Sequence, residues 1–295
     1  MDMFRFRDRA SVLDDRSRGF LTTVASLGGY VSAEQAQLLG IRNSTARVHN
    51  ELKDLESAGF IKRIATYPAV YQITKSVTRL IGADLSARRE HVAETIRTRL
   101  LTVNFYLEAT RWPVEFVFDH QQKISKFCGF GFDPGLLPQR GSKPYLWQDI
   151  VLEYPSGNLA VALVDDCVRS SSRQLSGLIQ RFAPSLRFIQ NELELLVVVG
   201  SEHRYRLFNR LLKRPRLQRL MPDISLHAAV KFYRVRRATP VVRLFPNSRQ
   251  LRELWTKNFF VEANRRSAQE PKHVTHNGAI HINNGVSAEK GDMSW

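Results

Sequence analysis

Apolar residues recur every three or four positions along the first quarter of the chain, and two short strand-like runs, FIKRI (60–64) and VYQIT (70–74), follow them. The first pattern is typical of helices that bury one face, and the second is typical of strands. Glycines separate the segments, which places turns between them. The predicted elements are helices at residues 15–27, 33–39 and 43–58 and strands at residues 60–64 and 70–74.

Helix, helix, glycine turn, helix and hairpin is the order of a winged helix-turn-helix domain, which we predict for residues 15–80. Ser32 and Gln35 have the spacing of a capping box at the start of the second helix. The inward face of the third helix is expected to carry Thr45, Val48, Leu52 and Leu55.

The opposite face of the third helix is expected to enter the major groove of double-stranded DNA, because it carries residue types that contact phosphates and base edges. Winged helices also serve as protein-docking modules, so a protein partner stays open as an alternative. The predicted DNA contacts are Asn43, Ser44, Arg47 and Asn50, with Lys62 and Arg63 of the hairpin near the flanking backbone.

The middle of the chain changes from a helical pattern to strands. Residues 81–112 are predicted to hold a connecting helix, whose apolar stripe is Val92, Ile96, Leu100, Val103 and Leu107. Residues 113–262 are predicted to form an α/β domain. Its core is a hairpin of residues 147–154 and 159–165, a helix from Ser171 that Pro184 interrupts, a buried strand at 193–199, and a helix after Gly200.

A strand, helix and strand in this order require a crossover, so the sheet is expected to be partly parallel. Residues 129–135 read as a glycine-rich loop that matches neither a dinucleotide fingerprint nor a P-loop. Residues 263–295 are polar and poor in apolar side chains, and we predict a disordered tail there.

The net charge of the chain indicates the class of partner that it binds. The 295 residues carry a net charge of +16, and residues 201–266 contribute 17 basic and 4 acidic side chains, a net charge of +13. A localised excess of this kind indicates a polyanion such as DNA. Arg210, Lys213 and Arg214 are the predicted contacts in this basic segment, and Phe232, Tyr233, Phe245 and Trp255 could stack on bases or belong to the core.

Other bulk features exclude several classes. Two cysteines, Cys128 and Cys167, cannot form a disulfide framework or a four-cysteine zinc site. No apolar run approaches the length of a membrane span, and the first ten residues lack the apolar stretch of a secretory signal. A cytoplasmic protein without a membrane partner is therefore expected.

Acidic residues in the predicted hairpin are the candidates for catalysis. A nuclease of the restriction-endonuclease type holds a divalent metal between carboxylates on two neighbouring strands, with a lysine near the attacking water. Asp149 lies on the first strand of the hairpin, and Asp165 and Asp166 end the second. These residues would bind Mg²⁺ or Mn²⁺ if the site is active; otherwise no cofactor is expected.

Two stretches also carry a family resemblance. LKDLESAGFIKRI (52–64) with VYQITK (70–75), and QDIVLEY (148–154) with LAVALVDDCVRSSSRQLSGLIQRF (159–182), resemble the replication-relaxation family of plasmid and integrative-element proteins and the related MobC-type mobilisation relaxases. The resemblance implies a winged helix followed by a restriction-endonuclease-like domain, an α+β chain overall. The family's acidic, acidic and lysine positions correspond here to Leu163, Asp165 and Arg169.

Arginine at the lysine position changes the chemistry, because a guanidinium cannot easily lose a proton. The resulting hypothesis is a sequence-specific DNA-binding protein of a mobile element that acts in transcription, replication or transfer and contains a degenerate nuclease fold. One alternative is a metal-dependent nicking relaxase that uses Asp149, Asp165, Asp166 and Arg169. The other is a docking module that binds replication or transfer proteins or a second copy of itself.

Overall fold

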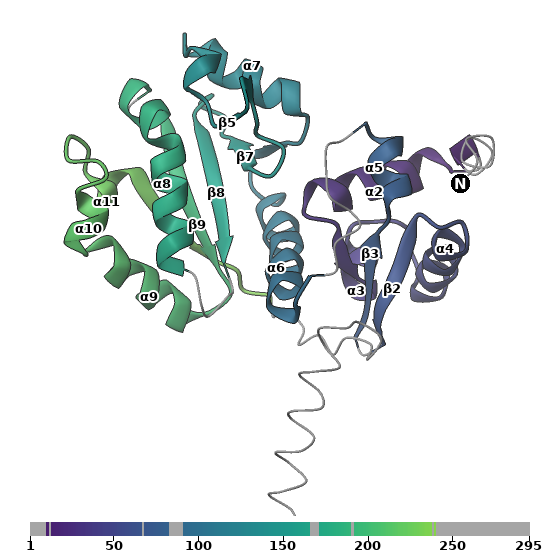
Figure 1. Cartoon of the computed structure of the whole chain (residues 1–295). Helices are drawn as coiled ribbons and strands as arrows, with labels where there is room; N and C mark the ends of the chain where they lie inside the picture. The colour runs from purple at the N-terminus through teal and green to yellow at the C-terminus, as the bar shows by residue number, and fades with distance from the viewer. Residues whose placement is uncertain are drawn as a thin grey trace, which may run out of the picture. The chain divides into compact units, whose positions relative to one another are not determined.

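The computed structural model describes residues 10–11, 13–66, 68–82, 91–165, 171–189, 192–237 and 239. The described residues belong to one compact unit and combine helices with two larger sheets (Figure 1). One sheet is antiparallel with three strands, and the other is mixed with five strands. The fold is therefore of the α+β class, as predicted. No helix in the described ranges is long and apolar enough to cross a membrane.

The N-terminal unit, which we define as residues 10–82, contains every element that the sequence predicts there. The helices are α2 (Asp15–Ser26), α3 (Ala33–Leu38) and α4 (Thr45–Ser57), and the hairpin strands are β2 (Ile61–Thr66) and β3 (Ala69–Ile73). Two short elements escaped prediction: strand β1 (Tyr30–Ser32), which pairs antiparallel with β3, and helix α5 (Lys75–Leu80).

The core of the N-terminal unit lies between the three helices and the hairpin. Val48, Leu52 and Leu55 of α4 are buried as expected, and they pack in one cluster with Leu21 of α2. Thr45 is exposed, contrary to expectation, because it is the first residue of α4 and precedes the turn that packs against the core.

The predicted capping box at the start of α3 is confirmed. The Ser32 hydroxyl accepts a hydrogen bond from the Gln35 amide, and the Gln35 side chain accepts one from the Ser32 amide. The Gln35 side chain also donates to the backbone oxygen of Leu100 and to the Oδ1 atom of Asn104, at 2.8 Å each. One glutamine thereby starts α3 and attaches it to the next long helix, α6 (Ala93–Ala109).

The five-stranded sheet has the strand order β10-β9-β8-β7-β4. The strands β4, β7 and β8 form an antiparallel meander, and β8, β9 and β10 run parallel to one another. The predicted hairpin and the partly parallel sheet are thus confirmed. The strands are β4 (Glu115–Val117), β7 (Ile150–Glu153), β8 (Leu159–Asp165), β9 (Leu193–Val199) and β10 (Val230–Arg234).

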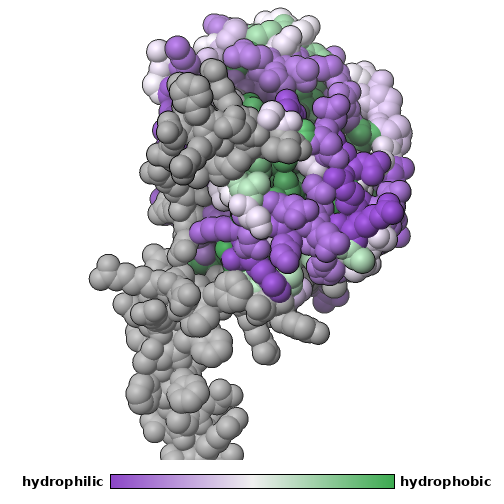
Figure 2. Space-filling model, turned by 90° about the vertical axis from the view of Figure 1, so that its right-hand side faces the viewer, coloured by the Kyte–Doolittle hydropathy of each residue, from purple (hydrophilic) through white to green (hydrophobic). Residues whose placement is uncertain are grey.

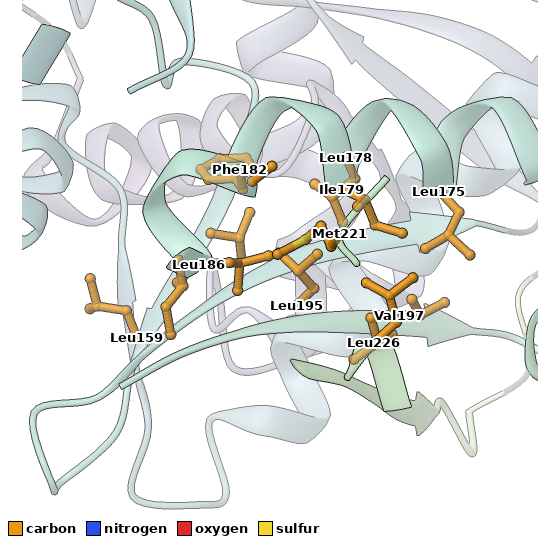
Figure 3. Close-up of a cluster of buried hydrophobic side chains, with 14 of the residues drawn as sticks. Leu159, Leu175, Leu178, Ile179, Phe182, Leu186, Leu195, Val197, Met221 and Leu226 are labelled. Carbon is orange, nitrogen blue, oxygen red and sulfur yellow. The ribbon is translucent and has the colours of Figure 1, made fainter. Parts of the chain in front are cut away.

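Helices cover both faces of this sheet (Figure 1). Helix α8 (Ser171–Phe188) connects β8 to β9, and helix α9 (Glu202–Leu212) follows β9. Odd-numbered positions of β8 and β9, such as Val161 and Val197, pack with α8 and α9 in one buried cluster. Figure 3 shows Leu175, Ile179 and Phe182 of α8 pointing toward the sheet. Two short helices, α10 (Pro215–Gln218) and α11 (Leu226–Ala229), precede β10.

Helix α6 packs on the opposite face of the five-stranded sheet. Leu101 and Phe105 belong to a buried cluster with even-numbered strand residues, including Ala162 and Val198. Ile96 and Leu100 pack instead with Tyr30 and Val70 of the N-terminal unit. The single apolar stripe predicted for this helix was therefore incomplete, because two different partners bury two of its sides, and it wrongly included Val92, which precedes the helix and is exposed.

Two parts of the second region, which we define as residues 91–239, differ from expectation. Helix α7 (His120–Gly129) was not predicted, although the turn-rich loop expected at 129–135 follows it and contains a 3₁₀ turn, η1 (Pro134–Leu136). Pro184 does not interrupt α8, which continues to Phe188. A proline removes one helical hydrogen bond, but the burial of Leu186 beyond it keeps the last turn packed on the sheet. Strands β5 (Gln139–Arg140) and β6 (Lys143–Pro144) form a separate small hairpin.

Candidate nucleic-acid interface

The start of α4 is fixed by Ser44. This residue is the N-cap, and its hydroxyl accepts a hydrogen bond from the backbone N–H of Arg47 at 3.4 Å. A serine N-cap stabilises a helix by satisfying one of its free amides. Asn43 and Ser44 therefore lie just before the helix, in an exposed turn, and Arg47 occupies its first turn.

The solvent side of α4 presents polar side chains without intramolecular partners. Arg47 and Asn50 are exposed, as the sequence predicts, and so are His49 and Lys53. Within the described ranges, none of these four side chains makes a hydrogen bond or an ion pair. Amide, imidazole and cationic groups of this kind are available to phosphates and base edges.

Two acidic residues near α4, Asp14 and Glu51, form ion pairs inside the N-terminal unit, whereas Asp54 of α4 is exposed. Arg42 forms ion pairs with Asp14 at 2.8 Å and with Glu51 at 2.7 Å, and the Ser17 hydroxyl donates to Glu51 at 2.7 Å. These contacts join the turn before α4 to α2. The carboxylate of Glu51 is thereby removed from competition with a phosphate, which the sequence alone did not show.

Lys62 and Arg63 of the hairpin, the other predicted DNA contacts of this unit, are less available to a ligand than the side chains of α4. Lys62 is half-buried, whereas Arg63 is exposed. The backbone N–H of Arg63 donates to Glu56 at 2.8 Å, and its Nε atom donates to the backbone oxygen of Ala65 at 3.3 Å. Hydrophilic residues cover most of the side of the molecule on which α4 and β2 lie (Figure 2).

The candidate catalytic residue Asp149 lies directly before β7 and is buried. Its carboxylate forms an ion pair with Arg181 of α8, and its backbone oxygen accepts from the Nζ atom of Lys123 at 2.7 Å. Burial raises the pKa of Asp149 above its usual value, while Arg181 and Lys123 act in the opposite direction. Lys123 of α7 is itself 4% exposed, and burial lowers its pKa to about 8.

The candidate Asp165 at the end of β8 is completely buried. Its carboxylate accepts from Nη2 of Arg204 at 2.7 Å, and the same guanidinium contacts the hydroxyl of Ser171. Asp149 and Asp165 both occupy odd-numbered positions of the hairpin, which face α8 and α9. The fold therefore brings them to the same face and the same end of the sheet, but it gives each a separate arginine.

This arrangement does not fit a divalent-metal centre among the described residues. A metal site of this type needs carboxylates that share a cation, whereas both carboxylates here already neutralise guanidinium groups. No group of three or more histidine, cysteine, aspartate or glutamate side chains in the described ranges is arranged to hold a metal. The predicted partners Asp166 and Arg169 lie outside the described residues.

The basic segment divides into buried and exposed parts. Arg210, Lys213 and Arg214, the predicted DNA contacts, are all exposed around the end of α9 and the start of α10. Phe232 and Tyr233 of β10 pack into the apolar clusters on the two faces of the five-stranded sheet, so they belong to the core and are not platforms on which bases stack. Phe245 and Trp255 lie outside the described residues.

Sequence reasoning missed several candidate residues. Lys53 lies three positions after Asn50, and helical spacing could have added it to the DNA-facing set. Lys123 and Arg181 carried no usable signal, because their contacts with residue 149 join segments that are 26 and 32 positions apart.

The comparisons with known proteins add no family: no family model, curated protein or solved structure matches this chain.

Proposed function

We propose that the chain is a sequence-specific DNA-binding protein whose N-terminal unit acts as a winged helix-turn-helix domain. The observation that carries the proposal is the exposed face of α4, where Arg47, Asn50 and Lys53 have no intramolecular partners in the described structure. The acidic neighbour Glu51 is held by Arg42, so its carboxylate does not pair with the cations of this face. The third helix of such domains enters the major groove.

We propose further that the second region is a degenerate nuclease-like domain of a mobile-element protein that acts in transcription, replication or transfer. The order α6, β4, β7, β8, α8 and β9, with an antiparallel meander followed by a parallel crossover, supports the restriction-endonuclease-like arrangement. The ion pairs of Asp149 and Asp165 with arginines favour binding over metal-dependent cleavage.

Replacing Arg47 with alanine is expected to reduce sequence discrimination with little change in non-specific affinity. A bidentate arginine contact with a base contributes about 1–3 kcal/mol of discrimination, which corresponds to a five- to 150-fold loss. Selection from a random duplex library would define the site for the wild-type protein, and gel shifts at fixed salt would compare both proteins on that site and on unrelated DNA.

Arg111→Ala provides the matched control, because Arg111 is an exposed arginine outside α4 and should leave discrimination unchanged. Unchanged discrimination in Arg47→Ala would contradict the proposed orientation of α4. Failure of the wild-type protein to bind any duplex would overturn the proposal and favour the protein-docking alternative.

Supercoiled plasmid incubated with the protein and Mg²⁺ or Mn²⁺ is expected to remain intact, because guanidinium groups occupy the candidate carboxylates. Agarose electrophoresis would detect a single nick. Metal-dependent nicking that Asp149→Ala removes would instead support the relaxase alternative and its use of Asp149, Asp165 and Asp166.

A further inference from the structure

A groove of about 630 Å³ lies between α8 and α10 on the outer surface of the second region. Its polar lining consists of three arginines, two serines and one glutamine: Arg173, Arg214, Arg216, Ser172, Ser176 and Gln180. The remaining lining consists of Leu217 in α10 and Leu220 just after it. The groove is therefore both concave and basic.

The charge in the groove is not compensated by the described part of the chain. No acidic residue in the described ranges lines it, and the side chains of Arg173, Arg214 and Arg216 make no ion pair there. The Ser176 hydroxyl donates its proton to the backbone oxygen of Arg173, so the exposed Ser172 hydroxyl is the hydroxyl donor that remains near the arginines. Guanidinium groups beside hydroxyls are suited to phosphate oxygens, which accept several charge-assisted hydrogen bonds.

The helical periodicity of α8 explains why these residues meet. Leu175, Ile179 and Phe182 point toward the sheet, so positions 173, 176 and 180 form a stripe on the opposite, solvent side (Figure 3). The buried side chain of Leu217 anchors α10 to the same core, which places Arg214 and Arg216 beside that stripe.

The groove and α4 belong to opposite sides of the five-stranded sheet. Helices α8 and α10 lie on one side of the sheet, and α6 covers the other (Figure 1). The N-terminal unit packs against the far side of α6 through Tyr30 and Val70. Helix α6 and the five-stranded sheet therefore lie between the N-terminal unit and the groove.

We propose that the α8–α10 groove binds the phosphate backbone of a second DNA segment while α4 holds the first. The inference rests on the proposed function, since it takes DNA binding by α4 as given. One protein molecule then bridges two segments, or two distant parts of one DNA molecule. Phosphate contacts of this kind carry no base readout, so the second segment can have any sequence.

The test is a capture experiment with the full chain. A biotinylated duplex that carries the selected site is immobilised and saturated with protein, and a fluorescent duplex of unrelated sequence is then added. Wild-type protein is expected to retain the second duplex, and Arg173→Ala/Arg216→Ala is expected to retain roughly tenfold less while still occupying the first. Loss of two phosphate contacts should also reduce the salt slope of capture by about 2.

Two further variants keep the result specific to the groove. Arg111→Ala/Lys231→Ala removes two exposed cations elsewhere and should capture as well as wild type. Ser172→Glu leaves the arginines in place but adds a carboxylate to the groove, and it should lose capture with an unchanged unfolding temperature.

Equal capture by wild type and the groove variants would overturn the second site even if α4 binds DNA. If the wild-type protein binds no duplex at all, the proposed function fails instead. Binding of inorganic polyphosphate, measured without DNA, then tests the groove separately: binding lost in Arg173→Ala/Arg216→Ala supports an anion groove, and binding equal in both proteins overturns it.

Discussion

Replacing Arg204 with methionine is expected to lower the free energy of unfolding by about 3–5 kcal/mol. The substitution keeps much of the side-chain length but leaves the completely buried carboxylate of Asp165 without the guanidinium that lies 2.7 Å away. An uncompensated buried charge costs far more than the ion pair itself contributes. Chemical denaturation would measure the change, and the unfolding temperature should fall by about 6–20 °C.

The double variant Asp165→Leu/Arg204→Met is expected to regain a large part of this loss. Replacing both members of a buried ion pair by apolar residues of similar size is often neutral or stabilising. A double-mutant cycle therefore separates the pair from the cost of leaving one charge alone. If Arg204→Met alone has no effect on stability, the buried pair does not form in solution.

Lys123 is expected to add about 2.5 kcal/mol to the stability of the protein as the pH rises from 7 to 10. Burial lowers the pKa of Lys123 from 10.5 to about 8 in the folded protein. Between these values the unfolded chain binds more protons than the folded one, so stability increases with pH. Below about pH 8 the lysine is charged in both states, and the cost of burying that charge is fully present.

Lys123→Met should remove most of this rise. The variant also leaves the backbone oxygens of Leu146 and Asp149 without the amino group that donates to them, so its stability at pH 10 should be lower than that of wild type. Lys126→Met is the matched control, since Lys126 lies three residues later in α7 and its side chain is much more exposed. Denaturation at several pH values up to 10 would show the slopes, and equal slopes for wild type and Lys123→Met would contradict the prediction.

The stability of Arg204→Met bears on the nicking experiment, because Asp149 and Asp165, the candidate metal ligands, each have a structural partner in Arg181 or Arg204. A large loss of stability in Arg204→Met, with plasmid left intact by the wild-type protein, would mean that this carboxylate now serves the fold. We expect that outcome.

The sequence by itself determined the elements whose signals are local. The periodicity of α4, the capping box at Ser32 and Gln35, and the hairpin of β7 and β8 depend on residues a few positions apart, and all of them are confirmed. The exposed position of Arg47 and Asn50 follows from the same periodicity, because burial of one helical face leaves the other in solvent.

The tertiary structure alone decided which charges meet. The contacts of Asp165 with Arg204 and of Asp149 with Arg181 join residues 39 and 32 positions apart, and Arg173 reaches the same groove as Arg216 through the packing of two helices. Charged side chains have no periodicity of their own that reveals a distant partner, since burial of the surrounding apolar residues places them. Hence the sequence indicated a DNA-binding helix, a basic segment and candidate catalytic carboxylates, but only the packed core showed that arginines neutralise those carboxylates and that Arg173 joins Arg214 and Arg216 in one groove.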